Sequence, residues 1–145
     1  MALKAQPNGY YMVTPSLVVD GAGQLIEFIK TAFGASERVR MPTPDGKVAH
    51  AEVEIGDCAV MVADGSDRFP AAGSFLHVYV SDVDNVYRRA LAAGATAITP
   101  VEDQFYGDRS GNVLDPWGNR WTISTHVEDV SEAEMESRMA AMAPA

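Results

Sequence analysis

The second half of the chain contains a run of apolar residues with helical spacing. The run begins at Val83, and its members recur at i, i+3, i+4, i+7 and i+8, which places them on one face of a helix. Asp82 stands in front of this stripe as a predicted N-cap, and Gly94 follows it as a predicted left-handed stop. The stripe consists of Val83, Val86, Tyr87, Ala90 and Leu91.

The first half of the chain repeats this pattern. A second apolar stripe with helical spacing is preceded by Asp20 and followed by Gly34. A short apolar strand comes before each stripe, at residues 16–20 and 77–81. Identity between the halves is weak, but the elements come in the same order, which indicates an internal duplication. The first stripe consists of Ala22, Leu25, Ile26, Ile29 and Phe33.

Three strand-like runs follow each predicted helix, separated by turns rich in proline, glycine and aspartate. Each half therefore reads as β-α-β-β-β. Two such sheets, each with one face covered by its helix, could curl towards one another and enclose a cavity. The sequence thus predicts an α+β fold of two tandem βαβββ modules whose curled mixed sheets surround a cavity. The predicted strands span residues 36–41, 47–55 and 58–63 in the first half and 96–100, 106–114 and 120–125 in the second.

The length of 145 residues fits one domain. We predict a single domain over residues 1–145, with the first module at about 11–64 and the second at about 75–126. The stretch 65–74, which is rich in Gly, Pro and Ser, is the predicted linker between them.

A C-terminal helix over residues 130–142 is indicated by the capping-box pattern that starts at Ser131. Met135, Met139 and Met142 follow at helical spacing. We expect this methionine stripe to pack in the core or against a second subunit.

The composition excludes several classes of protein. Eleven basic residues oppose twenty acidic ones, so the formal net charge is −9, a field that repels nucleic-acid phosphates. The longest apolar runs fall far short of the about 20 residues that a membrane-spanning helix needs. Cys58 is the single cysteine, so no internal disulfide argues for an oxidising compartment, and residues 1–11 show no secretory signal. We therefore expect a cytoplasmic protein that binds neither nucleic acid nor membranes.

Several motifs resemble one known family. Asp103-Gln-Phe-Tyr-Gly-Asp-Arg109 and Thr125-His-Val-Glu-Asp129 are similar to the PhnB-like branch of the vicinal-oxygen-chelate superfamily, which has the glyoxalase/bleomycin-resistance fold. The turn Asp115-Pro-Trp-Gly-Asn119 is common across that superfamily. The resemblance covers nearly the whole chain and implies the same paired βαβββ fold. Further similar segments are residues 13–20, 33–35, 50–57 and 77–84.

The resemblance also implies a metal site, in which His and Glu side chains hold an ion that chelates two neighbouring substrate oxygens. The family places one ligand at the start of the first strand of each half, and these positions fall on Thr14 and Phe75. The ligands of the last strands fall on Thr122 and on Met61 or Val62. None of these residues is His or Glu. We therefore expect that the metal site is lost and that no cofactor is bound.

Two histidines lie near these positions. His77 is two strand positions beyond Phe75 on the same face, and His126 shares the face of Thr122. A displaced metal site is one interpretation, although two histidines without a carboxylate on that face are a thin ligand set. His77 is otherwise a hydrogen-bonded wall residue, a ligand contact or an acid–base catalyst, since histidine titrates near neutrality. His126 could equally anchor the C-terminal tail.

Phe105, Tyr106 and Arg109 belong to a loop entering a strand, and the family pattern places them near the mouth of the pocket. Aromatic rings there could stack on a planar ligand, and the Arg109 guanidinium could clamp an anionic group. Alternatively, Arg109 pairs with Asp103 or Asp108 and holds the loop. The other residues expected to line the cavity and contact a ligand are Thr14, Ser16, Phe75, Tyr79, Thr122 and Ser124.

The patterns favour a metal-free protein that binds a small organic molecule, with a role in resistance or sequestration by analogy with relatives. The alternative is an enzyme of the same superfamily (a lyase, isomerase or dioxygenase) that uses a displaced metal ion or His77 as its catalytic residue. A third interpretation is an interaction module whose cavity is filled by its own side chains. We expect a homodimer, because family members commonly complete their cavities across a two-fold interface.

Overall fold

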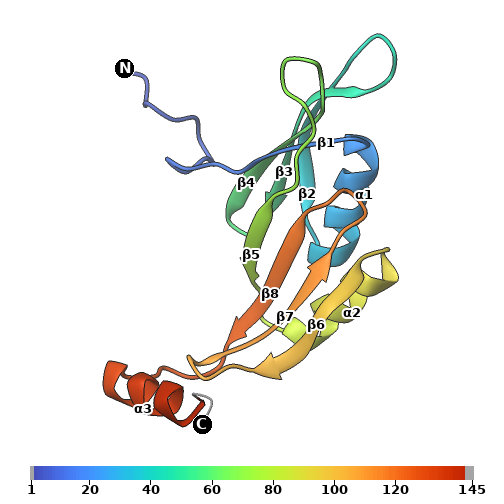
Figure 1. Cartoon of the computed structure of the whole chain (residues 1–145). Coiled ribbons are helices and arrows are strands. Elements are labelled where there is room, and N and C mark those ends of the chain that lie inside the picture. The colour runs from blue at the N-terminus through green and yellow to red at the C-terminus, as the bar shows by residue number, and fades with distance from the viewer. Residues whose placement is uncertain (1, 143–145) are drawn as a thin grey trace.

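The computed structural model describes residues 2–142 as two four-stranded sheets and three helices (Figure 1). Each half has the order βαβββ, and a C-terminal helix follows the second half, so the predicted α+β fold is confirmed. The first module contains β1 (Ser16–Val19), α1 (Ala22–Phe33), β2 (Ser36–Pro42), β3 (Val48–Ile55) and β4 (Cys58–Asp64). The second contains β5 (Phe75–Tyr79), α2 (Val83–Ala92), β6 (Thr96–Asp103), β7 (Asp108–Leu114) and β8 (Arg120–His126), and α3 is Glu132–Met142.

Both sheets are mixed and have the same strand order. Sheet A is ordered β1-β4-β3-β2 and sheet B is ordered β5-β8-β7-β6. β1 runs parallel to β4, and β5 runs parallel to β8. In both pairs each residue lies opposite the residue forty-five positions later in the chain: Ser16 opposite Met61, and His77 opposite Thr122. The two modules are therefore structural repeats with the same pairing register.

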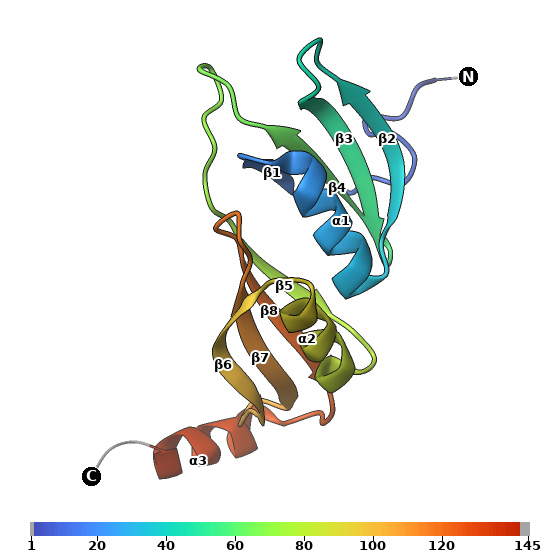
Figure 2. The same cartoon turned by 90° about the vertical axis from the view of Figure 1, so that its right-hand side faces the viewer.

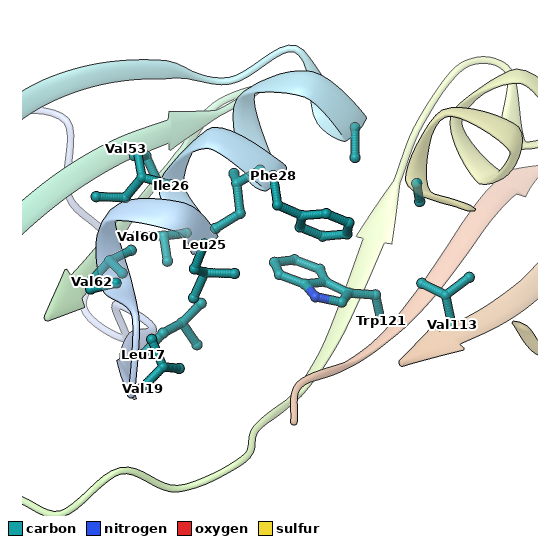
Figure 3. Packing of buried hydrophobic residues seen from close by; sticks show 14 of the residues in the cluster. Leu17, Val19, Leu25, Ile26, Phe28, Val53, Val60, Val62, Val113 and Trp121 are labelled. Carbon is teal, nitrogen blue, oxygen red and sulfur yellow. The ribbon is translucent and has the colours of Figure 1, made fainter. Parts of the chain in front are cut away.

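The two helices each cover one face of their own sheet and contact each other between the modules (Figure 2). The α1 stripe is confirmed, since Leu25, Ile26 and Ile29 are fully buried against sheet A (Figure 3). Trp121 of β8 is also buried, with its ring centroid 4.7 Å from that of Phe33, so one hydrophobic core spans both modules. Burial of each large apolar side chain contributes about 1.5–3 kcal/mol, and this core lies on the helix side of both sheets.

The two helices begin in different ways. Asp82 caps α2 as predicted, because its side chain accepts a hydrogen bond from the Asn85 N–H at 3.2 Å. Asp20 does not cap α1, whose N-cap is Gly21. Oδ1 of Asp64 in β4 instead accepts the N–H groups of Gly21 and Ala22 at 2.9 and 3.0 Å. A carboxylate distant in the sequence therefore replaces the local cap.

The turn before β8 is organised by Asp115, which is buried. Its Oδ1 accepts hydrogen bonds from the backbone N–H groups of Trp117 and Asn119, both at 2.9 Å. Its Oδ2 accepts the Trp121 indole N–H at 2.8 Å and the Asn119 side-chain amide at 3.0 Å. These bonds link the turn to the core and fix the start of β8.

The C-terminal helix α3 lies at the far end of sheet B, away from the core (Figure 1). None of its residues is buried, and Met139 and Met142 are 54% and 62% exposed. The prediction that the methionine stripe packs in the core of the chain is therefore wrong, whereas packing against a second subunit stays a prediction. Arg138 attaches the helix by donating a hydrogen bond to the Phe105 carbonyl at 3.1 Å and by pairing with Glu128. None of the helices within residues 2–142 has the length and apolarity needed to cross a membrane.

Candidate functional site on the open face of sheet B

The face of sheet B opposite α2, which we call the open face, carries alternate side chains of β5. Phe75, His77 and Tyr79 point to this face and are exposed, whereas Leu76 and Val78 point to the helix side and are half-buried. A strand with one face on the core requires this period of two. Phe75 is 84% exposed and Tyr79 is 62% exposed, so two large aromatic rings stand on open surface.

Cross-strand pairing adds polar side chains to the open face. His77 pairs with Thr122, and Tyr79 pairs with Ser124, both in β8. Thr122 and Ser124 pair in turn with residues of β7. The open face is therefore polar around the rings of β5, unlike the apolar helix side. Its members from β7 and the end of β8 are Asp108, Ser110, Asn112 and His126.

His77 is the middle residue of β5, the edge strand of sheet B that lies beside β8. Its Nε2 is 2.9 Å from Oγ of Ser124, in a hydrogen bond whose direction depends on the imidazole tautomer. Its ring stacks on that of Tyr79, with centroids 4.7 Å apart and planes 18° from parallel. Nδ1 makes no hydrogen bond to any residue within 2–142, so one ring nitrogen is left for a ligand.

A buried carboxylate holds the neighbouring side chains. Asp108 accepts a hydrogen bond from the Tyr79 hydroxyl at 2.8 Å and lies 2.8 Å from Nδ1 of His126. Nε2 of His126 is 2.7 Å from Asp129, so both ring nitrogens face carboxylates. Burial raises the pKa of Asp108, but the bonds from His126 and Tyr79 outweigh this and hold it below its usual range. The bonds to Asp108 and Asp129 raise the pKa of His126 and hold its ring in place.

A second network fixes the polar side chains beyond His77. The Thr122 hydroxyl donates to Oδ1 of Asn112 at 2.6 Å, and the Asn112 amide donates to the Thr99 hydroxyl at 2.8 Å. Thr122 has thus used its proton but keeps lone pairs. We infer that this part of the face offers acceptors to a ligand.

Sheet A contributes one expected residue to the same region. Ser16, Phe75 and His77 line a cavity of about 380 Å³ where β1 and β5 approach each other. Thr14 lies before β1, where its hydroxyl donates to the Tyr11 carbonyl at 3.0 Å. The structure therefore brings Ser16 to the site, whereas the Thr14 hydroxyl is occupied in its own segment.

The loop 104–107 places its residues differently. The rings of Phe105 and Tyr106 meet edge to face at 5.2 Å. Arg109 points to the helix side, where it makes two 2.9 Å hydrogen bonds to Asp84 of α2 and one of 3.1 Å to Asp103. The sequence left two roles for Arg109, clamping an anionic ligand or holding the loop. In the structure its guanidinium is shared between two carboxylates, which is the arrangement that holds the loop.

The open face does not fit a metal ion of the kind that the resemblance implies. Within residues 2–142, no three His, Cys, Asp or Glu side chains come together in a way that could hold a metal ion. His77 contacts Ser124, and both nitrogens of His126 face carboxylates, so the two imidazoles do not converge on one point where an ion could sit. No step through a metal ion is derived from these residues.

A sequence profile of the glyoxalase/bleomycin resistance protein/dioxygenase superfamily matches residues 11–123. The chain belongs to this superfamily. An uncharacterised protein of Mycobacterium bovis is 38% identical to it over 150 aligned positions, which cover 96% of both chains. An uncharacterised protein of Mycobacterium tuberculosis has the same identity, covering 96% of this chain and 86% of the relative.

Solved structures of the superfamily share the fold. TioX from Micromonospora sp. ML1 superposes with a TM-score of 0.70 at 26% identity, covering 81% of this chain and 99% of TioX. A PhnB protein from Bacillus cereus gives a TM-score of 0.62 at 17% identity, covering 79% of this chain and 99% of that protein. The sequence resemblance to the superfamily is therefore confirmed, and the second likeness shows the fold alone.

Sequence reasoning missed the role of Asp108. Its partners Tyr79 and His126 lie 29 and 18 positions away in the chain. The last two predicted strands, 106–114 and 120–125, form a hairpin around the turn at Asp115. Counting residue pairs away from that turn leads to Asp108 opposite His126, so this pairing could have been predicted. The bond to Tyr79 spans two strands, and nothing in the local pattern indicated it.

Proposed function

We propose that this superfamily member binds a small organic molecule against the open face of sheet B, without a metal ion. The observation that carries the proposal is the exposed, fixed pair of His77 and Tyr79 on β5, beside the polar side chains of β8 and β7. A planar ligand can lie on these rings, hydrogen-bond to Nδ1 of His77 and donate to Thr122. Such binding would serve resistance by sequestration of a harmful compound.

A second copy of the chain is the proposed cover of this face. Phe75 on the open face is 84% exposed, and Met12 and Val13 just before β1 are 91% and 83% exposed. Large apolar side chains with such high exposure are typical of surfaces that bind another protein. The homodimer would exclude water from the ligand, and a cytoplasmic location stays a prediction from the composition.

A His77-dependent enzyme is the second candidate, favoured by the free Nδ1 nitrogen. The His77–Ser124 pair has the spacing of a base and its nucleophile. Ser124 is fully buried, however, so no substrate carbonyl can reach its hydroxyl. His77 would therefore have to act alone, as a general acid or base.

Two measurements test the proposal. Plasma mass spectrometry of the untagged protein, before any chelator is used, should find no stoichiometric metal; near-stoichiometric Ni, Zn, Mn or Fe would contradict it. A library of ¹⁹F-labelled aromatic fragments, screened by NMR, should give binders that His77→Ala weakens. The matched control is Arg88→Ala on the exposed side of α2, which should leave the same fragments bound.

A further inference from the structure

A cavity of about 500 Å³ lies on sheet A, at the end of β1 and β4. It is separate from the His77–Tyr79 pair, neither of which lines it. The loop between β2 and β3 and the linker after β4 form its rim. Residues that matter for its chemistry are Ser16, Val18, Thr43, Lys47, Ala63 and Phe69.

The repeat explains why this cavity exists. Ser16 lies five residues before the N-cap of α1, and His77 lies five residues before the N-cap of α2, so these positions correspond. Two residues further on, the pair Val18–Ala63 corresponds to Tyr79–Ser124. Sheet B carries the Tyr79 ring at this position, whereas sheet A carries only the smaller Val18. The missing ring leaves open space on sheet A.

The lining of the cavity combines apolar walls with one available cation. Val18 and Ala63 form part of the walls, and Phe69 of the linker is 62% exposed at the rim. Lys47 is the only cationic residue of the lining, and it forms no ion pair within the described part of the chain. Asp64 also lines the cavity; burial raises the pKa of its carboxylate, but the three backbone N–H groups that it accepts, together with the nearby Lys47, outweigh this and lower the pKa. The carboxylate makes no ion pair of contact distance with the Lys47 ammonium within the described residues.

We propose that this cavity binds a small aromatic compound that carries one anionic group. The ring would lie between Val18, Ala63 and Phe69, and the carboxylate or sulfonate would meet the Lys47 ammonium. The volume is in the range of sites for drug-sized molecules. The inference rests on the proposed function, since it treats the faces opposite the helices as ligand-binding surfaces, and it names the class of ligand.

The test uses two fluorescent probes that differ in charge. 8-Anilinonaphthalene-1-sulfonate carries the anionic group, and N-phenyl-1-naphthylamine is its neutral counterpart. Both should bind the full-length protein, and Lys47→Gln should weaken the sulfonate by about threefold, as loss of one exposed ion pair predicts, without changing the neutral probe. Lys30→Gln is the control, because Lys30 lies outside the cavity and pairs with Glu27 and Glu37.

A filling variant tests the walls. Val18→Tyr restores the ring that sheet B carries and should abolish binding of both probes, whereas Val39→Tyr on β2, outside the cavity, should not. Circular dichroism and urea unfolding check that both variants fold. If Val18→Tyr does not fold, Phe69→Ala serves instead, since this exposed linker side chain can be removed without loss of core; it should weaken both probes.

The outcomes separate this inference from the proposed function. Unchanged probe binding in Lys47→Gln and Val18→Tyr would overturn the inference. If His77→Ala alone abolished binding, the ligand would lie on the open face, so the proposed function would stand and this cavity would not be the site. If neither probe bound and no ¹⁹F fragment bound, both would fail.

Discussion

Tyr79 donates its hydroxyl hydrogen to the buried Asp108 carboxylate over 2.8 Å, and the Tyr79 ring stacks on His77. The bond fixes the position of the ring and so fixes the plane against which the imidazole lies. Asp108 therefore acts on His77 through Tyr79. The superfamily fold supplies the strands, but this carboxylate determines how the open face presents its aromatic pair.

Replacing Asp108 should destabilise the protein. In Asp108→Asn only one of the two side-chain atoms can accept a hydrogen bond, so Tyr79 must reverse its bond or His126 loses its partner, and the negative charge beside His126 is removed. We expect a loss of about 1–3 kcal/mol in the free energy of unfolding, measured with urea. Asp103→Asn, whose carboxylate is 74% exposed, is the control and should change stability by less than about 0.5 kcal/mol. Equal losses in both variants would contradict a special role for Asp108.

Replacing His77 should affect binding more than stability. His77 is exposed on the open face, so His77→Ala should leave the free energy of unfolding within about 1 kcal/mol of the wild type. The ¹⁹F fragments that bind the wild type should bind more weakly, because the free Nδ1 and one of the stacked rings are lost. A much larger loss of stability in urea would mean that His77 is a structural residue.

The contribution of His126 to stability should depend on pH. Because Asp108 and Asp129 raise its pKa in the folded state, this contribution is complete below the unfolded-state pKa of about 6.5. It is lost as the pH rises through the higher folded-state pKa. The stability difference between the wild type and His126→Gln should therefore shrink as the pH rises above about 6.5. An NMR titration should show a lower His126 midpoint in Asp129→Asn, and an unchanged midpoint would contradict the pairing.

Gly107 should not tolerate a side chain. Its φ of +99° favours glycine, and an added Cβ would collide with the Glu128 carbonyl oxygen. Gly107→Ala should therefore destabilise the protein by about 1–3 kcal/mol in urea unfolding. Gly46→Ala is the control, since Gly46 has a φ of +85° but open space around its Cα, so only the backbone cost applies. Gly107→Ala should therefore lower the free energy of unfolding more than Gly46→Ala does.

The proposed homodimer makes Phe75 a sensitive position. Phe75→Glu would place a charge on an exposed ring position of the open face, and burying an unpaired charge in an interface is costly. Light scattering at micromolar concentration should find a dimer for the wild type and a monomer for Phe75→Glu. A wild-type monomer under these conditions would contradict the dimer.

The sequence predicted the elements well and the side-chain networks poorly. Both helices follow from their stripes, and the predicted strand 120–125 differs from β8 (Arg120–His126) by one residue. Helical and strand periods are local, so they can be read along the chain. The Asp64 cap of α1 could not be predicted, because it joins the end of β4 to residues more than forty positions earlier.

The orientation of Arg109 shows the same limit. Its place on β7 was predicted, but its direction depends on where strand alternation starts, and a one-residue difference reverses the face. The expectation that Arg109 lies near the pocket mouth came from the family pattern, which does not say which face of the strand the side chain takes. The Asp84 partner in α2 becomes visible only when helix and sheet are packed together.

The shared forty-five-residue register has a consequence for how this protein can diversify. The strands of each sheet pair only with strands of the same module. A side chain on the face opposite the helix of one sheet can therefore be exchanged without changing the strand register of the other sheet. Sheet B carries a fixed polar surface around Tyr79. At the corresponding positions sheet A carries the smaller side chains of Val18 and Ala63. The same strand framework therefore presents two faces with different chemistry, one on each sheet.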